Sequence, residues 1–241
     1  MYKMDISKKR LCHIKHILSL LNLYGSYGNI KQMQRGRIRM IRNIIFDMGW
    51  VLFSYEPEKY IKKYCHNEDD AELLNREIFE APEWVETDRG TMTDEDYLAL
   101  VLRRIPERLH KTARFLYGHW HEMPKPFPEI EELVRTIKNN GYRLYLLTNM
   151  STRFYRFYRN IPAVAYFDGM TVSADVHLLK PDPEIYLTLF RKFCLKPEEC
   201  FFIDDIPENI AAGEKLGMKG FCYAQNPGKL VEALESAGIK L

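Results

Sequence analysis

The fold class of this chain is decided by the stretch Asn43-Ile-Ile-Phe-Asp-Met-Gly-Trp-Val-Leu52. Its residues 44–46 form a short run of β-branched and aromatic side chains, which predicts a central strand covered on both faces. Asp47 follows this run, and Gly49 would permit a tight turn beside it. The Asp47 carboxylate is therefore expected at the carboxyl end of the strand, where ligands of open α/β sheets bind.

Three later segments repeat this arrangement of an apolar run or helix start next to polar groups. They are Leu146-Leu-Thr-Asn149, Leu179-Lys-Pro-Asp-Pro183 and Phe201-Phe-Ile-Asp-Asp205. Asp47 offers a nucleophile for a phosphoryl group, and Lys180 offers a compact cation for a phosphate oxygen. The pair Asp204-Asp205 suits a hard divalent cation. Each residue alone is most often a turn or capping residue, so the indication depends on their order, spacing and shared placement.

Strand and helix patterns alternate along most of the chain. Strand-like runs cover 43–47, 143–147, 170–173, 200–204 and 219–223. Helix-like segments cover 128–139, 152–159, 183–193, 207–216 and 227–237. Strands separated by helices of this length predict right-handed βαβ units, and hence an α/β fold with a Rossmann-like parallel sheet.

The interval between the first two strands is too long for a single crossover. It contains helical patterns over 59–66, 69–80, 94–105 and 108–121, with almost no strand signal. Thr93 is placed to cap one of these helices, with Asp96 in the position of the usual Glu. We therefore expect a small helical cap (residues 55–123) inserted after the first strand. The α/β core would then comprise residues 40–54 and 124–241.

Positive charge is concentrated at the start of the chain. Residues 1–42 hold ten Lys and Arg and one acid, a balance of +9, so the net charge of +2 leaves −7 for the remainder. A basic arm of this kind could bind nucleic acid or an anionic surface, or direct the chain to an organelle. Translation could also start at Met40. We favour a dispensable or disordered leader over residues 1–39, and we expect no nucleic-acid partner.

Composition narrows the class of protein further. The apolar share of 46% suits a well-filled core, and no uncharged apolar stretch approaches the roughly 20 residues of a membrane span. Five cysteines are scattered, odd in number and without metal-ligand spacing, which is typical of reduced thiols. A cytoplasmic protein without a membrane partner is expected. The sequence leaves its oligomeric state open.

The four segments together resemble motifs I to IV of the haloacid dehalogenase superfamily. The resemblance extends over about residues 41–230, and the Lys180-Pro and Asp204-Asp205 motifs are the most specific. Within subfamily IA, the chain is similar to the branch of sugar-phosphate phosphatases and the N-terminal phosphatase domain of soluble epoxide hydrolase. The stretch Val85-Glu-Thr-Asp-Arg-Gly-Thr-Met-Thr-Asp-Glu-Asp-Tyr97 resembles the helical cap of that branch, whose loop shapes the substrate pocket.

This resemblance implies a role for each motif residue. Asp47 would be the nucleophile and Lys180 an electrostatic clamp that also binds substrate, while Thr148 and Asn149 would bind the phosphoryl group. The implied cofactor is Mg²⁺, held by Asp47, Asp205 and the backbone carbonyl of Gly49. Asp204 and Asn209 would support this metal site. The implied reaction is hydrolysis of a small phosphorylated metabolite, with a sugar phosphate favoured, through an aspartyl-phosphate intermediate.

One position departs from the pattern of phosphatases in this superfamily. They usually carry a second Asp two residues after the nucleophile, where this chain has Gly49. That Asp protonates the leaving oxygen, and loss of a general acid typically costs about 10²–10⁴-fold in rate. We therefore expect the rate to depend steeply on the leaving group. His177, near Lys180, is a possible spare acid or base, although an exposed loop histidine is the simpler interpretation.

Two other functions fit the same residues. In a metal-independent haloacid dehalogenase, the aspartate would form a carboxylic ester. The pair Asp204-Asp205 argues against that chemistry, because a dehalogenase has no anionic phosphate to neutralise. A binding or regulatory protein that kept the fold and lost turnover through Gly49 is the third interpretation.

Overall fold

The computed structural model describes residues 40–241, which form one compact unit from Ile41 onward. The basic leader expected over residues 1–39 lies outside the described residues. No helix within the described part is both long and apolar enough to cross a membrane. Cys65, Cys200 and Cys222 carry free thiols.

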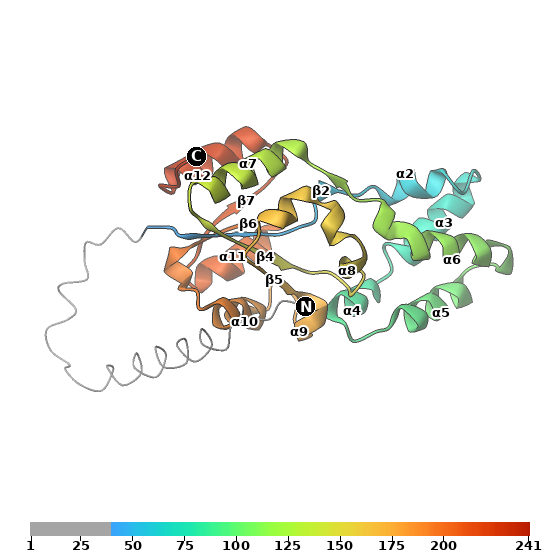
Figure 1. Ribbon diagram of the computed structural model, residues 1–241. Coiled ribbons are helices and arrows are strands. Elements are labelled where there is room, and N and C mark those ends of the chain that lie inside the picture. Colours follow the sequence, from blue (N-terminus) through green and yellow to red (C-terminus); the bar gives the residue numbers. More distant parts are fainter. Residues whose placement is uncertain (1–39) are drawn as a thin grey trace, which may run out of the picture. The chain divides into compact units, whose positions relative to one another are not determined.

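A five-stranded parallel sheet forms the centre of this unit, as predicted (Figure 1). The strand order is β5-β4-β1-β6-β7. The strands are β1 (Asn43–Phe46), β4 (Arg143–Thr148), β5 (Gly169–Val172), β6 (Cys200–Asp204) and β7 (Lys219–Cys222). Asn43 pairs with Arg143 on one side and with Cys200 on the other, so β1 is the central strand. All four residues of β1 are buried, which explains the apolar run over residues 44–46.

Helices cover both faces of the sheet. Because side chains alternate along a strand, Ile44 and Phe46 of β1 point to one face and Ile45 to the other. The first face packs against α7 (Pro128–Asn139) and α12 (Pro227–Ser236). The second face packs against α10 (Pro183–Phe193) and α11 (Pro207–Lys215). Figure 1 shows the two pairs on opposite sides of the strands.

The predicted helix boundaries are close to the observed ones where a proline marks the start of the helix. Helices α7 and α10 match their predicted ranges, and the backbone N–H of Glu184 donates to the Asp182 side chain at the start of α10 (2.9 Å). The range predicted as one helix over 152–159 is wrong. It holds only the short α8 (Phe154–Phe157), followed by the 3₁₀ turns η3 (Tyr158–Asn160) and η4 (Pro162–Tyr166). Phe154 and Phe157 are buried while Tyr155 between them is exposed, and Pro162 prevents a helix from continuing past Ile161.

Between β1 and β4 the chain builds a separate group of helices, which we call the cap. Its elements are α2 (Pro57–Lys62), α3 (Glu68–Ile78), α4 (Trp84–Arg89), α5 (Asp94–Arg104), η1 (Glu107–Leu109), α6 (His110–His119) and η2 (Trp120–Glu122). Thr93 caps α5 as predicted, accepting from the Asp96 backbone N–H at 3.1 Å. Helix α4 was missed by the sequence patterns. It is six residues long and ends at Gly90 with a left-handed φ of 74°.

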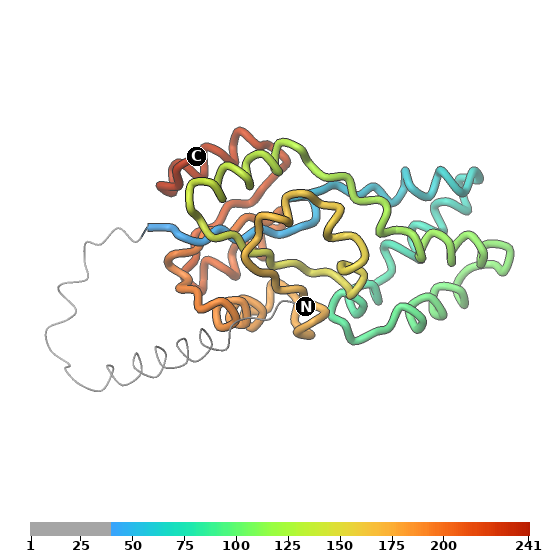
Figure 2. The backbone as a smooth tube through the Cα atoms, in the orientation of Figure 1, coloured from blue at the N-terminus to red at the C-terminus, as the bar shows by residue number. Residues whose placement is uncertain are grey.

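A short antiparallel pair marks the two passages of the chain between core and cap. It joins β2 (Phe53–Ser54) and β3 (Lys125–Pro126), each of two residues and therefore too short to give a strand pattern. Both passages can be followed in the tube of Figure 2.

Two further contacts fasten the cap to the core. Ser173, at the start of α9 (Ser173–Val176), donates its hydroxyl to the backbone carbonyl of Asp88 in α4 (2.5 Å). The buried Arg153 donates from Nε to Asp94 Oδ1 of α5 (2.8 Å). Its guanidinium also lies 3.6 Å from the centre of the Tyr117 ring. The cap is thus held to the core at α4 and at α5.

Candidate active site

The candidate nucleophile lies at the carboxyl end of the central strand. Asp47 directly follows β1, and its backbone N–H donates to the carbonyl of Ile203 at 2.8 Å. Its side chain is mostly buried but reaches the cavity described below. The turn after it differs from expectation, because Trp50 and not Gly49 takes the left-handed conformation (φ 56°). A Cβ atom added to Gly49 would have no further neighbour within 4 Å, so open space lies beside this residue.

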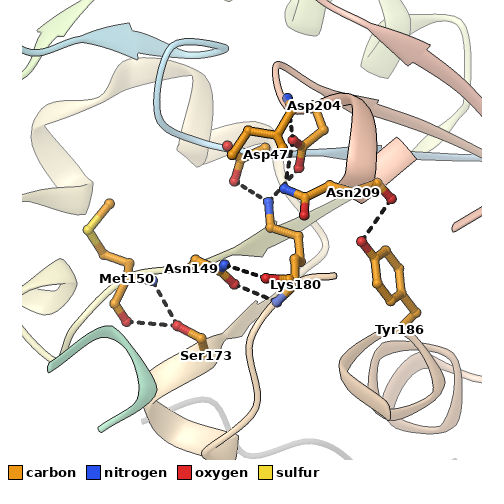
Figure 3. A network of polar contacts seen from close by, with 9 residues as sticks. Asp47, Asn149, Met150, Ser173, Lys180, Tyr186, Asp204 and Asn209 are labelled. Atoms are coloured by element: carbon orange, nitrogen blue, oxygen red, sulfur yellow. Dashed lines mark hydrogen bonds and ion pairs between the residues drawn. The ribbon is translucent and has the colours of Figure 1, made fainter. Parts of the chain in front are cut away.

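One lysine joins two of the predicted carboxylates. The Lys180 Nζ donates to Asp47 Oδ1 and to Asp204 Oδ2, each at 2.6 Å (Figure 3). The Lys180 and Asp204 side chains are almost completely buried, at 1% and 0% exposure. The structure therefore brings motifs I, III and IV together around one ammonium group.

Asn149 positions this lysine. Its side-chain Nδ2 donates to the Lys180 carbonyl (2.9 Å), and the Lys180 backbone N–H donates to its Oδ1 (2.8 Å). Figure 3 shows the two bonds side by side. Thr148, the preceding residue at the end of β4, is buried and lines the same cavity.

The two adjacent acids of motif IV differ in their surroundings. Asp204 Oδ1 accepts from the Asn209 side chain and from the Ile206 backbone N–H, each at 2.9 Å, and Oδ2 accepts from Lys180. Asn209 is itself fixed, because its backbone carbonyl accepts a hydrogen bond from the Tyr186 hydroxyl at 2.9 Å. Both oxygens of Asp204 thus have protein donors. Asp205 is only partly buried and forms no ion pair within residues 40–241.

The donor set fits a hard divalent cation. Asp47, Asp204 and Asp205 each offer an oxygen, and these atoms lie within 4.8 Å of one another. Because Asp204 already accepts from three donors, Asp47 and Asp205 are the carboxylates with capacity for an ion. Gly49 lines the same cavity and could add its carbonyl oxygen. Oxygen ligands of this kind suit Mg²⁺.

Electrostatics in the site also favour an added cation. Burial raises the pKa of Asp47 to about 7, although the Lys180 ammonium acts in the opposite direction. Burial, followed by the charge of Asp204, raises the pKa of Asp205 above its ordinary value. Burial alone would lower the pKa of Lys180, but Asp47 and Asp204 outweigh it, and the pKa is raised. One ammonium therefore faces three carboxylates, and the excess of negative charge would be reduced by a bound metal ion.

A cavity of about 240 Å³ joins these residues to the cap. The core contributes all the predicted site residues except Asp204, which lies behind Lys180. The other wall is mainly aromatic and sulfur-containing, and it is formed by Trp50, Phe53, Tyr55, Phe79, Trp84, Trp120, Met123 and Met150. Asp88 is the acidic residue of α4 that lines it.

His177 does not line this cavity, so its interpretation as a spare acid or base is not supported. Its Nδ1 lies 3.1 Å from the backbone carbonyl of Arg89, and it ends α9 in a left-handed conformation. Sequence reasoning missed Asp88 and Ser173. The signal available for Asp88 was its place in the cap stretch 85–97, two residues before Gly90.

The comparison with known families agrees with this geometry. Residues 41–217 match the model of the family described as haloacid dehalogenase-like hydrolase. The match extends over well more than half of the chain. The chain therefore belongs to the haloacid dehalogenase-like hydrolase family, and it is a hydrolase by that membership.

Individual relatives include two phosphatases. The chain is 25% identical over 202 residues to the sesquiterpene phosphatase astK of Aspergillus oryzae, covering 80% of this chain and 95% of that protein. It is 26% identical over 207 residues to a phosphorylated carbohydrates phosphatase of Thermotoga maritima, covering 82% and 92%. Among solved structures, a haloacid dehalogenase family enzyme of Bacteroides thetaiotaomicron shares the fold. It has a TM-score of 0.62 at 19% identity, covering 80% of this chain and 98% of that one.

Proposed function

We propose that the protein is a Mg²⁺-dependent phosphatase that hydrolyses a small phosphorylated metabolite through an aspartyl-phosphate. The observation that carries this proposal is the position of Lys180 between Asp47 and Asp204, in a cavity that also contains Asp205. The names of the two phosphatase relatives support the reaction class. The structure of the Bacteroides enzyme with magnesium and inorganic phosphate supports the ion for a protein of this fold.

Each residue has a definite task in this reaction. An Asp47 oxygen attacks phosphorus, while the Thr148 hydroxyl and the Lys180 ammonium stabilise the phosphoryl oxygens. Asn149 and Asp204 hold Lys180 in place through the bonds described above. Bound Mg²⁺ supplies the positive charge that reduces repulsion between the carboxylate and the anionic phosphate. Water then attacks the aspartyl-phosphate and releases inorganic phosphate.

The alternatives are less well supported. A metal-independent dehalogenase would have no use for Asp205, a carboxylate in the site without an ion-pair partner among residues 40–241. A purely binding protein would not need a carboxylate and an ammonium held at 2.6 Å in a buried cavity. These arguments favour catalysis on an anionic substrate.

The aromatic wall bears on the substrate. A sugar phosphate could place an apolar ring face against Trp84 or Trp120, which agrees with the carbohydrate phosphatase relative. The wall offers few hydrogen-bonding groups for several hydroxyls, however. This composition favours a second candidate class, phosphate esters of hydrophobic or planar groups, which agrees with the sesquiterpene phosphatase relative.

A direct test uses purified wild-type protein and the Asp47→Asn variant with p-nitrophenyl phosphate. We expect turnover that requires Mg²⁺, is abolished by EDTA, and is absent in the variant. Release of halide from 2-chloropropionate without metal would establish the dehalogenase alternative. A folded protein that turns over neither substrate class would contradict the proposal. Once turnover is established, comparison of sugar phosphates with aryl and isoprenoid phosphates ranks the two substrate classes.

A further inference from the structure

A phosphatase of this kind needs a proton for the leaving oxygen, and Gly49 cannot supply it. The lining of the cavity contains two other candidates outside the nucleophile and metal site, the Tyr55 hydroxyl and the Asp88 carboxyl. Lys180 is a poor proton donor, because its bonds to Asp47 and Asp204 hold its pKa above the ordinary value. We propose that Asp88, supplied by the cap, is the general acid that protonates the leaving oxygen in place of the residue missing at Gly49. This inference rests on the proposed phosphatase function.

The backbone of Asp88 is fixed to the core beside the loop at the end of β4, residues 148–150, which we call the phosphate-binding loop. The Ser173 hydroxyl that donates to its carbonyl also accepts from the backbone N–H of Met150 at 2.8 Å. Met150 lies two residues after Thr148, and its bonds with Ser173 are visible in Figure 3. One hydroxyl therefore joins the cap residue to the loop that carries the phosphoryl ligands.

The two residues after Asp88 also contact the core directly. The Arg89 carbonyl is in contact with the His177 ring, as described above. Gly90 packs so closely on α9 that an added Cβ would lie 2.5 Å from the Ala174 carbonyl oxygen. Such close packing, at a positive φ, requires glycine. A general acid must be held within hydrogen-bond reach of its target, and these contacts provide that rigidity.

The environment of the Asp88 side chain favours the protonated form. Its Oδ1 atom is buried and has no hydrogen-bond partner within the described structure. Burial raises the pKa of Asp88 to about 8, against the opposing effects of the Ser151 backbone N–H and the Trp84 side chain. At neutral pH the group therefore carries a proton that it can donate. A carboxyl kept neutral by its surroundings is a recognised acid in enzymes.

The groups that face Asp88 do not offer a competing proton. No Lys, Arg or His among the described residues forms an ion pair with it. Tyr55 lines the same cavity, and burial followed by the charges of Asp88, Asp205 and Asp47 raises its pKa. Tyr97, beneath α4, is buried with its hydroxyl donating to the Ile78 carbonyl (2.7 Å). Burial raises the pKa of Tyr97 as well. Both phenols are therefore weaker acids than Asp88 at neutral pH.

The two half-reactions balance with Asp88 as the proton carrier. In the first, Asp47 Oδ forms a bond to phosphorus and the bond from phosphorus to the leaving oxygen breaks. The electron pair stays on that oxygen, which takes the proton of Asp88 and departs as an alcohol. In the second, Asp88 carboxylate accepts a proton from water as the water oxygen attacks phosphorus. The bond from phosphorus to Asp47 breaks, which restores both residues and releases phosphate.

The test compares wild type with Asp88→Asn on two substrates, p-nitrophenyl phosphate and a primary alkyl phosphate, in the presence of Mg²⁺. An amide keeps the shape of the side chain but donates no acidic proton. We expect kcat for the alkyl phosphate to fall by about 10²–10⁴-fold and kcat for p-nitrophenyl phosphate by less than about 10-fold, because nitrophenolate departs without a proton. The loss of wild-type kcat at alkaline pH should also disappear in the variant.

Glu86→Gln is the matched control, because it removes a carboxylate from the same helix that does not line the cavity. It should leave both rates and the pH profile unchanged, and Asp88→Glu should restore part of the alkyl phosphate rate. Equal losses on the two substrates, with an unchanged pH profile, would overturn the acid role and leave the phosphatase proposal intact. Failure of the folded wild type to hydrolyse either phosphate would overturn both proposals.

Discussion

The side chain of Asn149 and the backbone of Lys180 exchange two hydrogen bonds, one in each direction, at 2.9 and 2.8 Å. This pairing ties the end of β4 to the loop before α10. The lysine ammonium can therefore reach Asp47 and Asp204 from a fixed position. Asn149 is thus a positioning residue for the site in addition to its expected place near the phosphoryl group.

Asn149→Ala should lower kcat more than it changes KM, because Lys180 would lose its alignment with the reacting groups. Removal of both bonds from a part-buried pair should also cost about 1–3 kcal/mol in the free energy of unfolding. Steady-state kinetics and urea denaturation measure the two effects. An unchanged kcat would show that Lys180 keeps its position without this pairing.

Asp47→Asn should abolish turnover and leave the fold intact, because the amide has nearly the shape of the carboxylate but is a far poorer nucleophile. Circular dichroism and a thermal melt check folding, and phosphate release measures activity. Substantial turnover by the folded variant, with contaminating phosphatase excluded, would contradict a covalent mechanism.

Substitutions of the two acids of motif IV should have different effects, one on metal binding and the other on the stability of the fold. Asp205→Asn should remove the rise in melting temperature that Mg²⁺ gives to the wild type, with little change in its absence. Asp204→Asn should destabilise the protein without metal, by about 3 kcal/mol or more, because it leaves a buried charge-assisted network incomplete. Melting curves with and without Mg²⁺ test both variants, and reversed behaviour would mean that the roles are exchanged.

The raised pKa of Asp88 predicts a pH dependence of stability. In the folded protein its pKa is about 8, against an ordinary value of 3.8, so the folded state binds the proton more tightly than the unfolded state. The favourable contribution is complete below about pH 4 and is lost as the pH rises towards 8. Asp88→Asn should therefore become more stable relative to wild type between pH 5 and pH 9. Urea denaturation at several pH values checks this sign, and a constant difference would contradict it.

Gly49→Asp should restore part of the alkyl phosphate rate when it is combined with Asp88→Asn. The open space around a Cβ at Gly49 allows the side chain, and its position beside the nucleophile suits a proton donor. Recovery of about 10-fold or more over Asp88→Asn alone would support the exchange of acids. The same double variant should show no comparable gain on p-nitrophenyl phosphate.

Much of the core and most of the site could be predicted because the relevant signals are local. The apolar run before Asp47, the Asp182-Pro183 helix start and the adjacent pair Asp204-Asp205 each carry their information within a few residues. The missed features depend on contacts between distant segments. The Ser173 hydroxyl and the Asp88 carbonyl are 85 positions apart in sequence, and no pattern of spacing encodes that contact. The turn expected at Gly49 has its left-handed residue one position later, at Trp50, and no local preference of a tryptophan predicts that conformation.

The attachment of the cap at α4 and at α5 has a consequence for which molecules can react. An enclosure held on two sides by Ser173 and Arg153 cannot widen freely around a bulky group. If the protein is a phosphatase, the cavity of about 240 Å³ would act as a size filter, because the phosphate end would be common to all substrates and the space beneath the aromatic wall would set the limit. Selectivity in this protein would come from exclusion by volume more than from a specific set of hydrogen bonds.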